Sequence, residues 1–146
     1  PWRGGDKLNI YHETIKLETG GFPDIIDLSR EISDVLSRSG IRDGLLTVFV
    51  PGSTAGITTI EYEPGLLRDL PALCEKLAPR GVDYHHDQTW HDGNGFSHLL
   101  AALFKPSLSV PLEKGSPILG TWQQVVLADF DNRPRSRRIV IQAMGK

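Results

Sequence analysis

The sequence predicts an α+β fold with a mainly antiparallel β-sheet or sandwich and two or three helices. Strand-like runs outnumber helical stripes, and several of them follow one another closely between residues 107 and 143. The strict alternation of strands and helices that would predict a parallel sheet is missing. The 15 Gly and 10 Pro among 146 residues also exceed average usage, and they predict many turns rather than a helix bundle.

Length and composition bound the class of protein. A chain of 146 residues predicts one domain, residues 1–146, because domains commonly hold about 100–200 residues. Hydrophobic residues make up 39% of the chain and charged residues 23%, as in globular proteins. The formal net charge of −2 argues against nucleic-acid binding, which favours a basic surface.

The compartment is predicted from what the chain lacks. No apolar run approaches the roughly 20 residues of a membrane span. Residues 1–6 are polar and lack the apolar core of a signal peptide. One cysteine, which cannot form an internal disulfide, fits a reducing compartment. We therefore expect a cytoplasmic protein without membrane contact.

The first two elements have clear periodic signals. Residues 8–18 alternate apolar and polar side chains, which predicts a strand. Apolar side chains three and four positions apart predict a helix over residues 28–39. Asp27 is a residue type that caps helix N-termini, and Gly40 is one that ends helices.

The middle of the chain predicts two strands and a second helix. Residues 45–50 and 55–62 are rich in residues that favour strands. A leucine stripe predicts a helix over residues 65–77, with Pro71 as a kink or a restart point. The polar stretch 79–97 that follows is predicted as a long loop.

The last part of the chain predicts a short helix over residues 98–104 and three strands, at 107–112, 117–128 and 136–143. Cys74 lies on the apolar side of the second helix, so we expect a packed thiol rather than a nucleophile. The residues expected in the core are Leu46, Val48, Phe49, Ile57, Leu70, Leu73, Leu108, Val110, Val125, Leu127, Ile139 and Ile141.

Histidines concentrate in one segment. Four of the five His residues lie within residues 83–98. Neutral imidazole binds divalent metals and accepts protons, and a Gly-Asn-Gly turn between His86 and His98 can bring their rings together. The spacing matches no standard zinc motif, so a solvated loop without a ligand is an equal alternative.

Four other segments offer polar groups. Residues 52–56 can present backbone N–H groups to an anion, although a strand bend made of small residues is the more frequent structure. Glu61 is a lone carboxylate, either buried with partners or exposed. Residues 120–124 can contact a ligand or form a bulge with a packed Trp. The basic run 133–138 can hold a phosphate, although a solvated hairpin face is more frequent.

Taken together, these segments resemble the YjbQ family over about residues 8–145. The motifs are Pro51-Gly52-Ser53-Thr54-Ala55-Gly56-Ile57-Thr58 with Glu61, Tyr84-His85-His86-Asp87, Asn94-x-x-x-His98, Pro106-Ser107-Leu108, Leu119-Gly120-Thr121-Trp122-Gln123 and Asp129-Phe130-Asp131-x-x-Pro134-Arg135. The resemblance implies an α+β fold and a homotrimer. Members usually carry three histidines in these motifs. His86 and His98 match two of them, and Gly52 stands at the third position.

The activity implied by the resemblance is secondary thiamine-phosphate synthesis, in which a thiazole nitrogen displaces diphosphate from a pyrimidine methylene. His86, His98 and Glu61 are then the catalytic residues, and His86 and His98 bind a divalent metal, zinc or magnesium. A further metal ligand is open among His85, His91, Glu61 and Asp87. The expected contacts to the phosphorylated substrate are Gly52, Ser53, Thr54, Asn94, Gln123 and Arg135.

Two other functions stay open beside this transferase. One is a metal-assisted hydrolase or phosphatase of a small phosphorylated metabolite, and the other is a non-catalytic trimer that binds a metal or a small molecule. A departing diphosphate needs cationic stabilisation, usually from Mg²⁺, and the sequence has no Asp/Glu-rich motif for that ion. Metal analysis with a turnover assay distinguishes the three functions.

Overall fold

Two antiparallel sheets and four helices make up the computed structural model, which describes residues 7–146. The larger sheet has the order β1 (Asn9–Thr19), β8 (Arg135–Gly145), β3 (Gly44–Phe49), β5 (Ser107–Glu113) and β6 (Ser116–Pro117). The smaller sheet has the order β2 (Asp24–Asp27), β7 (Gln124–Asp129) and β4 (Ala55–Ile60). The helices are α1 (Ser29–Ser39), α2 (Leu66–Leu77), α3 (His85–Trp90) and α4 (Gly95–Phe104). The predicted α+β class is confirmed.

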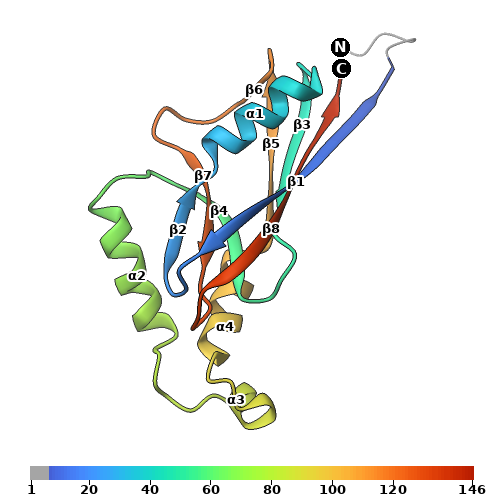
Figure 1. The fold of residues 1–146 in the computed structure, drawn as a ribbon. Helices are drawn as coiled ribbons and strands as arrows, with labels where there is room; N and C mark the ends of the chain where they lie inside the picture. The colour runs from blue at the N-terminus through green and yellow to red at the C-terminus, as the bar shows by residue number, and fades with distance from the viewer. Residues whose placement is uncertain (1–6) are drawn as a thin grey trace.

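The smaller sheet lies between two hydrophobic clusters. The main cluster fills the space between the two sheets and under α1, whose stripe of Ile32, Val35 and Leu36 is buried. The second cluster joins the opposite face of the smaller sheet to α2 and α4 (Figure 1). The central strand, β7, is therefore covered on both faces, and five of its six residues are buried.

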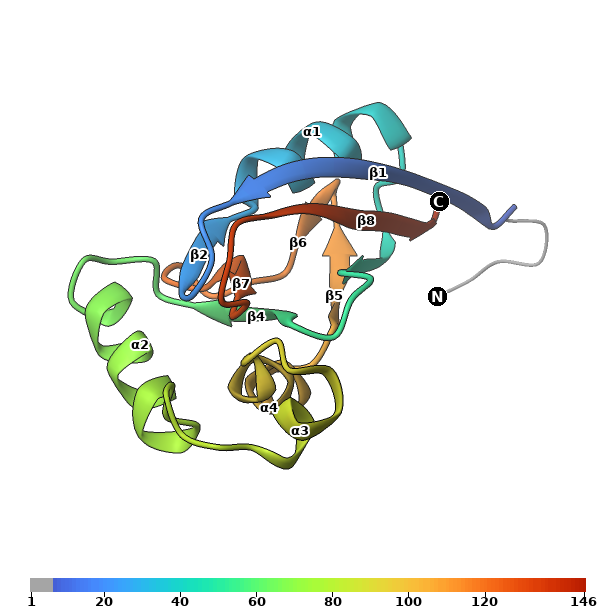
Figure 2. The same ribbon diagram turned by 60° about the horizontal axis from the view of Figure 1, so that its bottom comes forward.

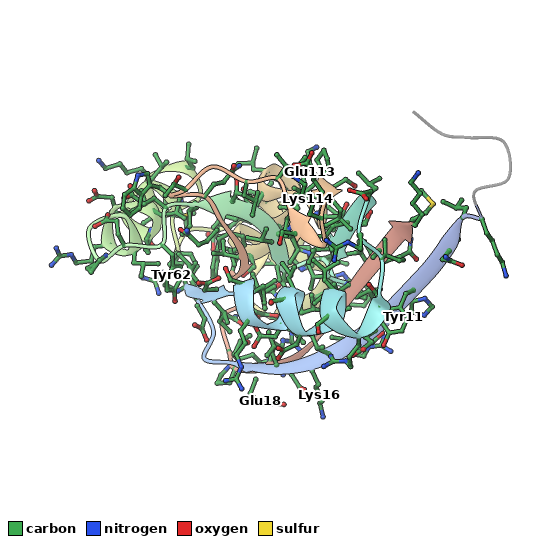
Figure 3. All side chains as sticks on the ribbon, turned by 90° about the horizontal axis from the view of Figure 1, so that it is seen from above. Tyr11, Lys16, Glu18, Tyr62, Glu113 and Lys114 are labelled. Carbon is green, nitrogen blue, oxygen red and sulfur yellow. The ribbon has the colours of Figure 1, made fainter. Side chains whose placement is uncertain are left out.

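The edge strand β1 follows the predicted alternation. Ile15 and Leu17 pack against the main cluster, whereas Lys16 and Glu18 are exposed and point away from the body (Figure 3). Tyr62, just after β4, donates a hydrogen bond from its hydroxyl to the carbonyl oxygen of Ile25 at 2.9 Å. This bond ties the end of β4 to β2 across the small sheet.

Most residues expected in the core are buried, namely Leu46, Val48, Ile57, Val110, Val125, Leu127, Ile139 and Ile141. Leu70 and Leu108 are half-buried. Phe49 and Leu73 are 39% and 50% exposed in the single chain, because they lie on the outer faces of β3 and α2. Cys74 is buried as expected, and burial raises the pKa of its thiol.

Several predicted elements differ from the structure. The expected strand 117–128 begins only at Gln124, because residues 120–123 form a turn in which Gln123 N–H donates to the Gly120 carbonyl at 3.0 Å. Trp122, expected to be packed there, is 71% exposed in the single chain. Helix α3 lies inside the expected loop, and β2 follows the first strand without having been predicted. Pro71 lies inside α2 without ending it.

No helix of residues 7–146 combines the length and the apolar character needed to cross a bilayer. The expectation about a signal peptide concerns residues 1–6, which lie outside the described residues.

Strand register brings distant segments together at one end of the molecule. Ala55 pairs with Asp129 across β4 and β7, and Thr19 pairs with Arg135 across β1 and β8. The β3–β4 loop and the β7–β8 turn therefore lie close to each other, with α3 and α4 beside them (Figure 2). This end is opposite to the C-terminus (Figure 1), and it carries most of the polar side chains predicted to be functional.

Candidate functional site

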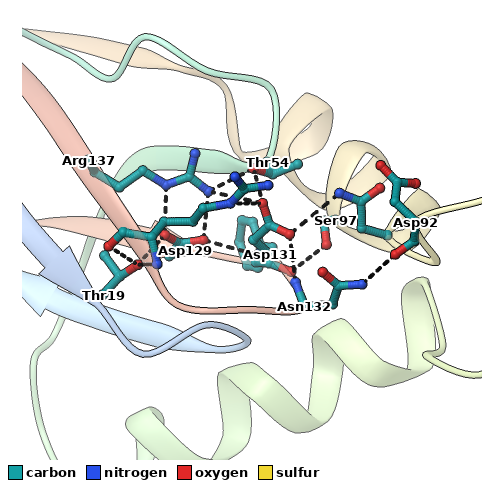
Figure 4. Close-up of polar contacts among 11 residues, drawn as sticks. Thr19, Thr54, Asp92, Ser97, Asp129, Asp131, Asn132 and Arg137 are labelled. Atoms are coloured by element: carbon teal, nitrogen blue, oxygen red, sulfur yellow. Dashed lines mark hydrogen bonds and ion pairs between the residues drawn. The ribbon is translucent and has the colours of Figure 1, made fainter. Parts of the chain in front are cut away.

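A buried ion pair forms the base of this end. Arg137 donates from Nε to Oδ2 of Asp129 at 2.7 Å and from Nη2 to Oδ1 at 2.8 Å (Figure 4). The hydroxyl of Thr19 also donates to Oδ2 of Asp129, at 2.6 Å. Arg137 is buried because it occupies the same inward-facing series of β8 as Ile139 and Ile141. The solvated hairpin face expected for the basic run is therefore wrong for Arg137.

Asp131 forms a second buried centre of the same network. Its Oδ2 accepts from Nε of Arg135 at 2.7 Å and from the hydroxyl of Thr54 at 3.0 Å. Its Oδ1 accepts from the backbone N–H of Asn132 at 2.8 Å. Thr54 in turn accepts from Nη2 of Arg137 at 2.7 Å, so both arginines belong to one network.

Both carboxylates are held in the ionised form. Burial acts to raise the pKa of Asp129, but hydrogen bonds from Arg137, Thr19 and the Asp131 backbone outweigh it and leave the pKa below its ordinary value. The pKa of Asp131 is lowered in the same way, against burial, chiefly by hydrogen bonds from Arg135 and Thr54. Two carboxylates therefore balance two guanidinium groups.

Two histidines stack beside this network. The ring centroids of His86, on α3, and His98, on α4, are 4.1 Å apart, with the ring planes at 33°. Asp87 links the two helices, since its Oδ1 accepts from the backbone N–H of Gly95 at 2.9 Å. Gly95 is required at this contact, because a Cβ there would lie 2.6 Å from Cβ of Tyr84.

The ring of His86 points one nitrogen at two carboxylates. Its Nδ1 lies 3.5 Å from Oδ1 of Asp87 and 3.7 Å from Oδ1 of Asp92. Ligand atoms of these three residues lie within 4.8 Å of one another. The Nδ1 atom is buried and has no hydrogen-bond partner among the described residues. Ligand atoms around a tetrahedral zinc are about 3.4 Å apart, so the spacing fits a divalent cation.

His98 differs from His86 in its position, because it lies outside this group of ligand atoms. Burial, followed by the proximity of His86, lowers the pKa of His98 below its ordinary value. The neutral form of the His98 ring is therefore favoured near neutral pH, and a neutral imidazole can accept a proton or bind a metal.

A polar pocket of about 370 Å³ adjoins the cluster of His86, Asp87 and Asp92 and shares Asp92 with it. The other lining residues are Asn94, Asn132, Arg133 and Arg135. The Asn94 amide lies between two carboxylates. With its NH₂ toward Asp92 the donor–acceptor distances are 3.0 and 3.2 Å, and with its NH₂ toward Asp131 the distance is 3.4 Å. The shorter pair favours the orientation toward Asp92.

The structure brings some of the predicted site residues together. Gly52, Ser53 and His98 line a second pocket of about 210 Å³, and Thr54 belongs to the buried network. Asn94 and Arg135 line the polar pocket.

Other predicted site residues lie elsewhere. Glu61 is exposed and follows the far end of β4, about 20 Å along the strand from Ala55. Gln123 donates to Thr59 at 3.1 Å and lines a separate pocket between β4 and β5. His85 and His91 are exposed and lie outside the cluster of His86, Asp87 and Asp92.

Sequence reasoning missed the acidic half of the site. Asp92, Asp129 and Asp131 were not selected as candidates, although each contacts a residue that was. The available signal was spacing. Asp129 and Asp131 lie two residues apart at the end of a buried strand, and Arg135 and Arg137 lie two residues apart at the start of the next one. The short turn between the two strands brings these opposite charges together, although β7 and β8 belong to different sheets.

Comparisons with known proteins identify the family of the chain. Residues 13–146 match the family described as UPF0047 protein YjbQ-like. A UPF0047 protein of Methanothermobacter thermautotrophicus is 39% identical over 139 residues, which cover 95% of this chain and 95% of that one. A second, from Archaeoglobus fulgidus, is 38% identical over 130 residues, or 89% of this chain and 98% of the relative.

Solved structures show the same fold. A YbjQ-like protein of unknown function from Sulfolobus solfataricus superposes with a TM-score of 0.90 at 26% identity, covering 96% of this chain and 100% of that chain. A YjbQ/UPF0047 protein from Clostridium acetobutylicum gives a TM-score of 0.80 at 32% identity, covering 90% and 98%. These matches confirm the resemblance found in the sequence motifs: the chain belongs to the YjbQ/UPF0047 family, a family of uncharacterised function.

Proposed function

We propose that the protein is a divalent-cation-dependent hydrolase of a small phosphorylated metabolite. The observation that carries the proposal is the orphaned, buried Nδ1 atom of His86, which faces Asp87 and Asp92 at 3.5 and 3.7 Å. Asp92 also lines the pocket that contains Arg133 and Arg135. Asp92 therefore belongs both to the basic pocket and to the group of His86, Asp87 and Asp92, which we call the cation-binding group.

The residues around His86 fit a zinc- or magnesium-type ion. An imidazole nitrogen and carboxylate oxygens are ordinary ligands for such cations. Gly95 fixes Asp87 through its backbone N–H, and the Asn94 amide can fix Asp92, as outer partners commonly do for ligating carboxylates. A bound cation would neutralise charge on the departing phosphate and acidify a coordinated water.

The basic pocket fits a phosphate group. Arg135 uses its Nε on Asp131, and its terminal nitrogens make no hydrogen bond to any described residue. Asp131 thereby holds the guanidinium plane in place while leaving its outer edge available, and Arg133 is exposed beside it. A guanidinium edge binds phosphate oxygens in a bidentate manner. The pocket volume of about 370 Å³ suits one small metabolite.

His98 is the group that we assign to proton transfer. Its neutral ring lies against His86, and such a ring can accept a proton from a water that the bound cation would acidify. Glu61 has no part in this pocket of the single chain.

A second candidate is the thiamine-phosphate synthase reaction implied by the family resemblance. The adjacency of Arg133, Arg135 and a cation-binding group also suits a departing diphosphate, which carries more negative charge than a phosphate. That reaction needs no general base, so His98 distinguishes the two candidates.

The first experiment measures cation binding. We expect zinc or manganese titrated into the apoprotein to bind, and His86→Ala and Asp92→Asn to lose that binding. The matched control is His85→Ala, because His85 is an exposed neighbour outside the cation-binding group. Equal affinity in the wild type and in both site variants would remove the basis of the proposal.

The second experiment measures turnover with the bound cation. Phosphate released from small phosphate monoesters, lost on chelation and in His98→Gln, supports the hydrolase. Thiamine phosphate formed from the pyrimidine diphosphate and the thiazole phosphate supports the transferase instead. Cation binding without either product would support a non-catalytic binding protein.

A further inference from the structure

The loop between β3 and β4 is fixed at both sides but has unpaired donors. Val50 N–H donates to the Pro106 carbonyl at 2.8 Å, and the Thr54 carbonyl accepts from Phe130 N–H at 3.0 Å. Between these anchors, the backbone N–H groups of Gly52, Ser53 and Thr54 have no hydrogen-bond partner among residues 7–146. Thr54 is 6% exposed. Successive unpaired N–H groups of this kind form anion-binding concavities.

A second, independent group points at the same loop. The side chain of Arg137 is only 9% exposed, and its Nε and Nη2 atoms are occupied by Asp129 and Thr54. Its Nη1 atom makes no hydrogen bond to any residue that the structure describes. Figure 4 shows one terminal nitrogen of Arg137 outside the network of contacts.

Both oxygens of the Asp129 carboxylate already accept hydrogen bonds from other donors, so neither is available to Nη1 of Arg137. Oδ1 of Asp129 accepts from Nη2 of Arg137 and from Asp131 N–H, and Oδ2 accepts from Thr19 and from Nε of Arg137. Nη1 is not a buried atom, so it reaches the surface beside Gly52. It can therefore bind an acceptor that arrives from solvent.

Gly52 is the residue that leaves this nitrogen uncovered. A Cβ built on Gly52 would lie 3.3 Å from Nη1 of Arg137, and the φ angle of +147° disfavours other residue types. Gly52 and Ser53 also line the pocket of about 210 Å³ that His98 borders. Any larger side chain at position 52 would cover the guanidinium edge.

We infer that Nη1 of Arg137 and the Gly52–Thr54 backbone form a binding subsite for the phosphate group of a phosphate monoester, separate from the pocket of Arg133 and Arg135. A phosphate group offers enough acceptor oxygens for the guanidinium edge and the loop N–H groups together. The subsite contains no cation ligand, so it binds phosphate without a divalent cation and does not depend on the proposed hydrolysis.

The test is an amide-resolved NMR titration of the ¹⁵N-labelled protein with inorganic phosphate and with methyl phosphate, in the presence of a chelator. We expect both probes to produce saturable shifts at the Gly52, Ser53 and Thr54 amides. Gly52→Ala should weaken the affinity by about tenfold or more, because the new methyl group covers a charged donor. Gly81→Ala is the control, since Gly81 also has a positive φ, +77°, but an added Cβ there meets nothing within 4 Å.

Four outcomes of the NMR titration would overturn the proposed subsite. Shifts confined to residues 132–135 would place phosphate in the polar pocket alone and overturn the subsite. Unchanged affinity in Gly52→Ala would do the same. Binding of inorganic phosphate without methyl phosphate would overturn the monoester as its ligand. If Gly52→Ala does not fold, the wild-type titration decides, and the absence of shifts at the Gly52, Ser53 and Thr54 amides of the wild-type protein refutes the inference.

Discussion

Arg137 and Asp129 bind each other through two parallel hydrogen bonds of 2.7 and 2.8 Å, at a place where the carboxylate is fully buried. They come from adjacent ends of β7 and β8. Each charge is therefore placed by a strand rather than by a flexible loop. The pair connects the main core to the polar end of the molecule, because Arg137 also holds Thr54 in the β3–β4 loop.

The first prediction concerns stability. Replacing Asp129 by Asn removes the carboxylate that binds Arg137 through two hydrogen bonds and leaves only Asp131, whose Oδ2 lies 3.7 Å from Nη2 of Arg137. Breaking one side of such a pair costs about 3–5 kcal/mol, and urea unfolding should show that loss. Glu75→Gln, which breaks the exposed pair with Arg80, is the control and should change the unfolding free energy little. Similar small effects for both variants would contradict the role given to the buried pair.

The second prediction concerns the stability of the protein at acidic pH. The pKa values of Asp129 and Asp131 lie below their ordinary value of 3.8. A depressed pKa in the folded state stabilises the protein above the unfolded pKa, and this stabilisation is lost as pH falls through the folded value. The unfolding free energy should therefore decline as pH drops below about 4. The decline should be shallower in Asp129→Asn, and parallel curves for the two proteins would show that Asp129 is not its source.

The third prediction concerns the contact between α3 and α4. A Cβ at Gly95 would lie 2.6 Å from Cβ of Tyr84 and 3.3 Å from Oδ1 of Asp87. Gly95→Ala must push the helices apart, which should cost about 1–3 kcal/mol and weaken cation binding. Gly120→Ala is the control, because the nearest atoms there are 3.7 Å away. Wild-type cation affinity in Gly95→Ala would mean that this contact does not position Asp87.

The fourth prediction concerns the pH profile of turnover. The pKa of His98 lies below its ordinary value of 6.5, because of burial and the nearby His86 ring. The proton-accepting form therefore persists below that pH, and kcat/KM for a phosphate monoester should stay level until the solution is more acidic than 6.5. His98→Gln should abolish this limb of the profile. A limb centred above 6.5 would assign proton transfer to another group.

The fifth prediction concerns assembly. Leu99 and Leu103 lie one turn apart on α4 and are 49% and 62% exposed in the single chain. A family-like homotrimer would cover such a surface, so sedimentation should give three times the mass of the chain. We expect Leu103→Lys to weaken the trimer and Lys16→Glu, on the outer edge of β1, to leave it intact. A wild-type monomer at micromolar protein would refute the homotrimer.

Sequence patterns predicted the fold well where local periodicity matches burial. The alternation of β1 and β8 and the stripe of α1 reflect one face turned to the core. The continuous apolar run of β7 reflects burial on both faces. The patterns failed where tertiary contacts decide. Helix α3 has no buried residue, so its sequence carries no apolar stripe that would predict a helix. Strand β2 forms through its pairing with β7 rather than through its own composition.

The candidate site was predictable only in part. His86 and His98 were placed together because a turn of small residues separates them, and the structure does bring them together. The carboxylates of Asp129 and Asp131 were missed because their importance lies in partners across β8 and the β3–β4 loop. A basic run such as 133–138 is usually solvated, and only the register of β8 shows that Arg137 points inward.

The double coverage of β7 has a consequence for how the site moves. Amide protons of a strand enclosed on both faces exchange with solvent chiefly through global unfolding. Asp129 is the last residue of such a strand, so we expect it to stay in place until the whole protein unfolds. Helix α3 buries none of its residues and can open locally at a lower free-energy cost. The arginine side of the site is therefore the more stable half. In the proposed function, the local opening of α3, which carries His86 and Asp87, would set how fast a cation enters and leaves.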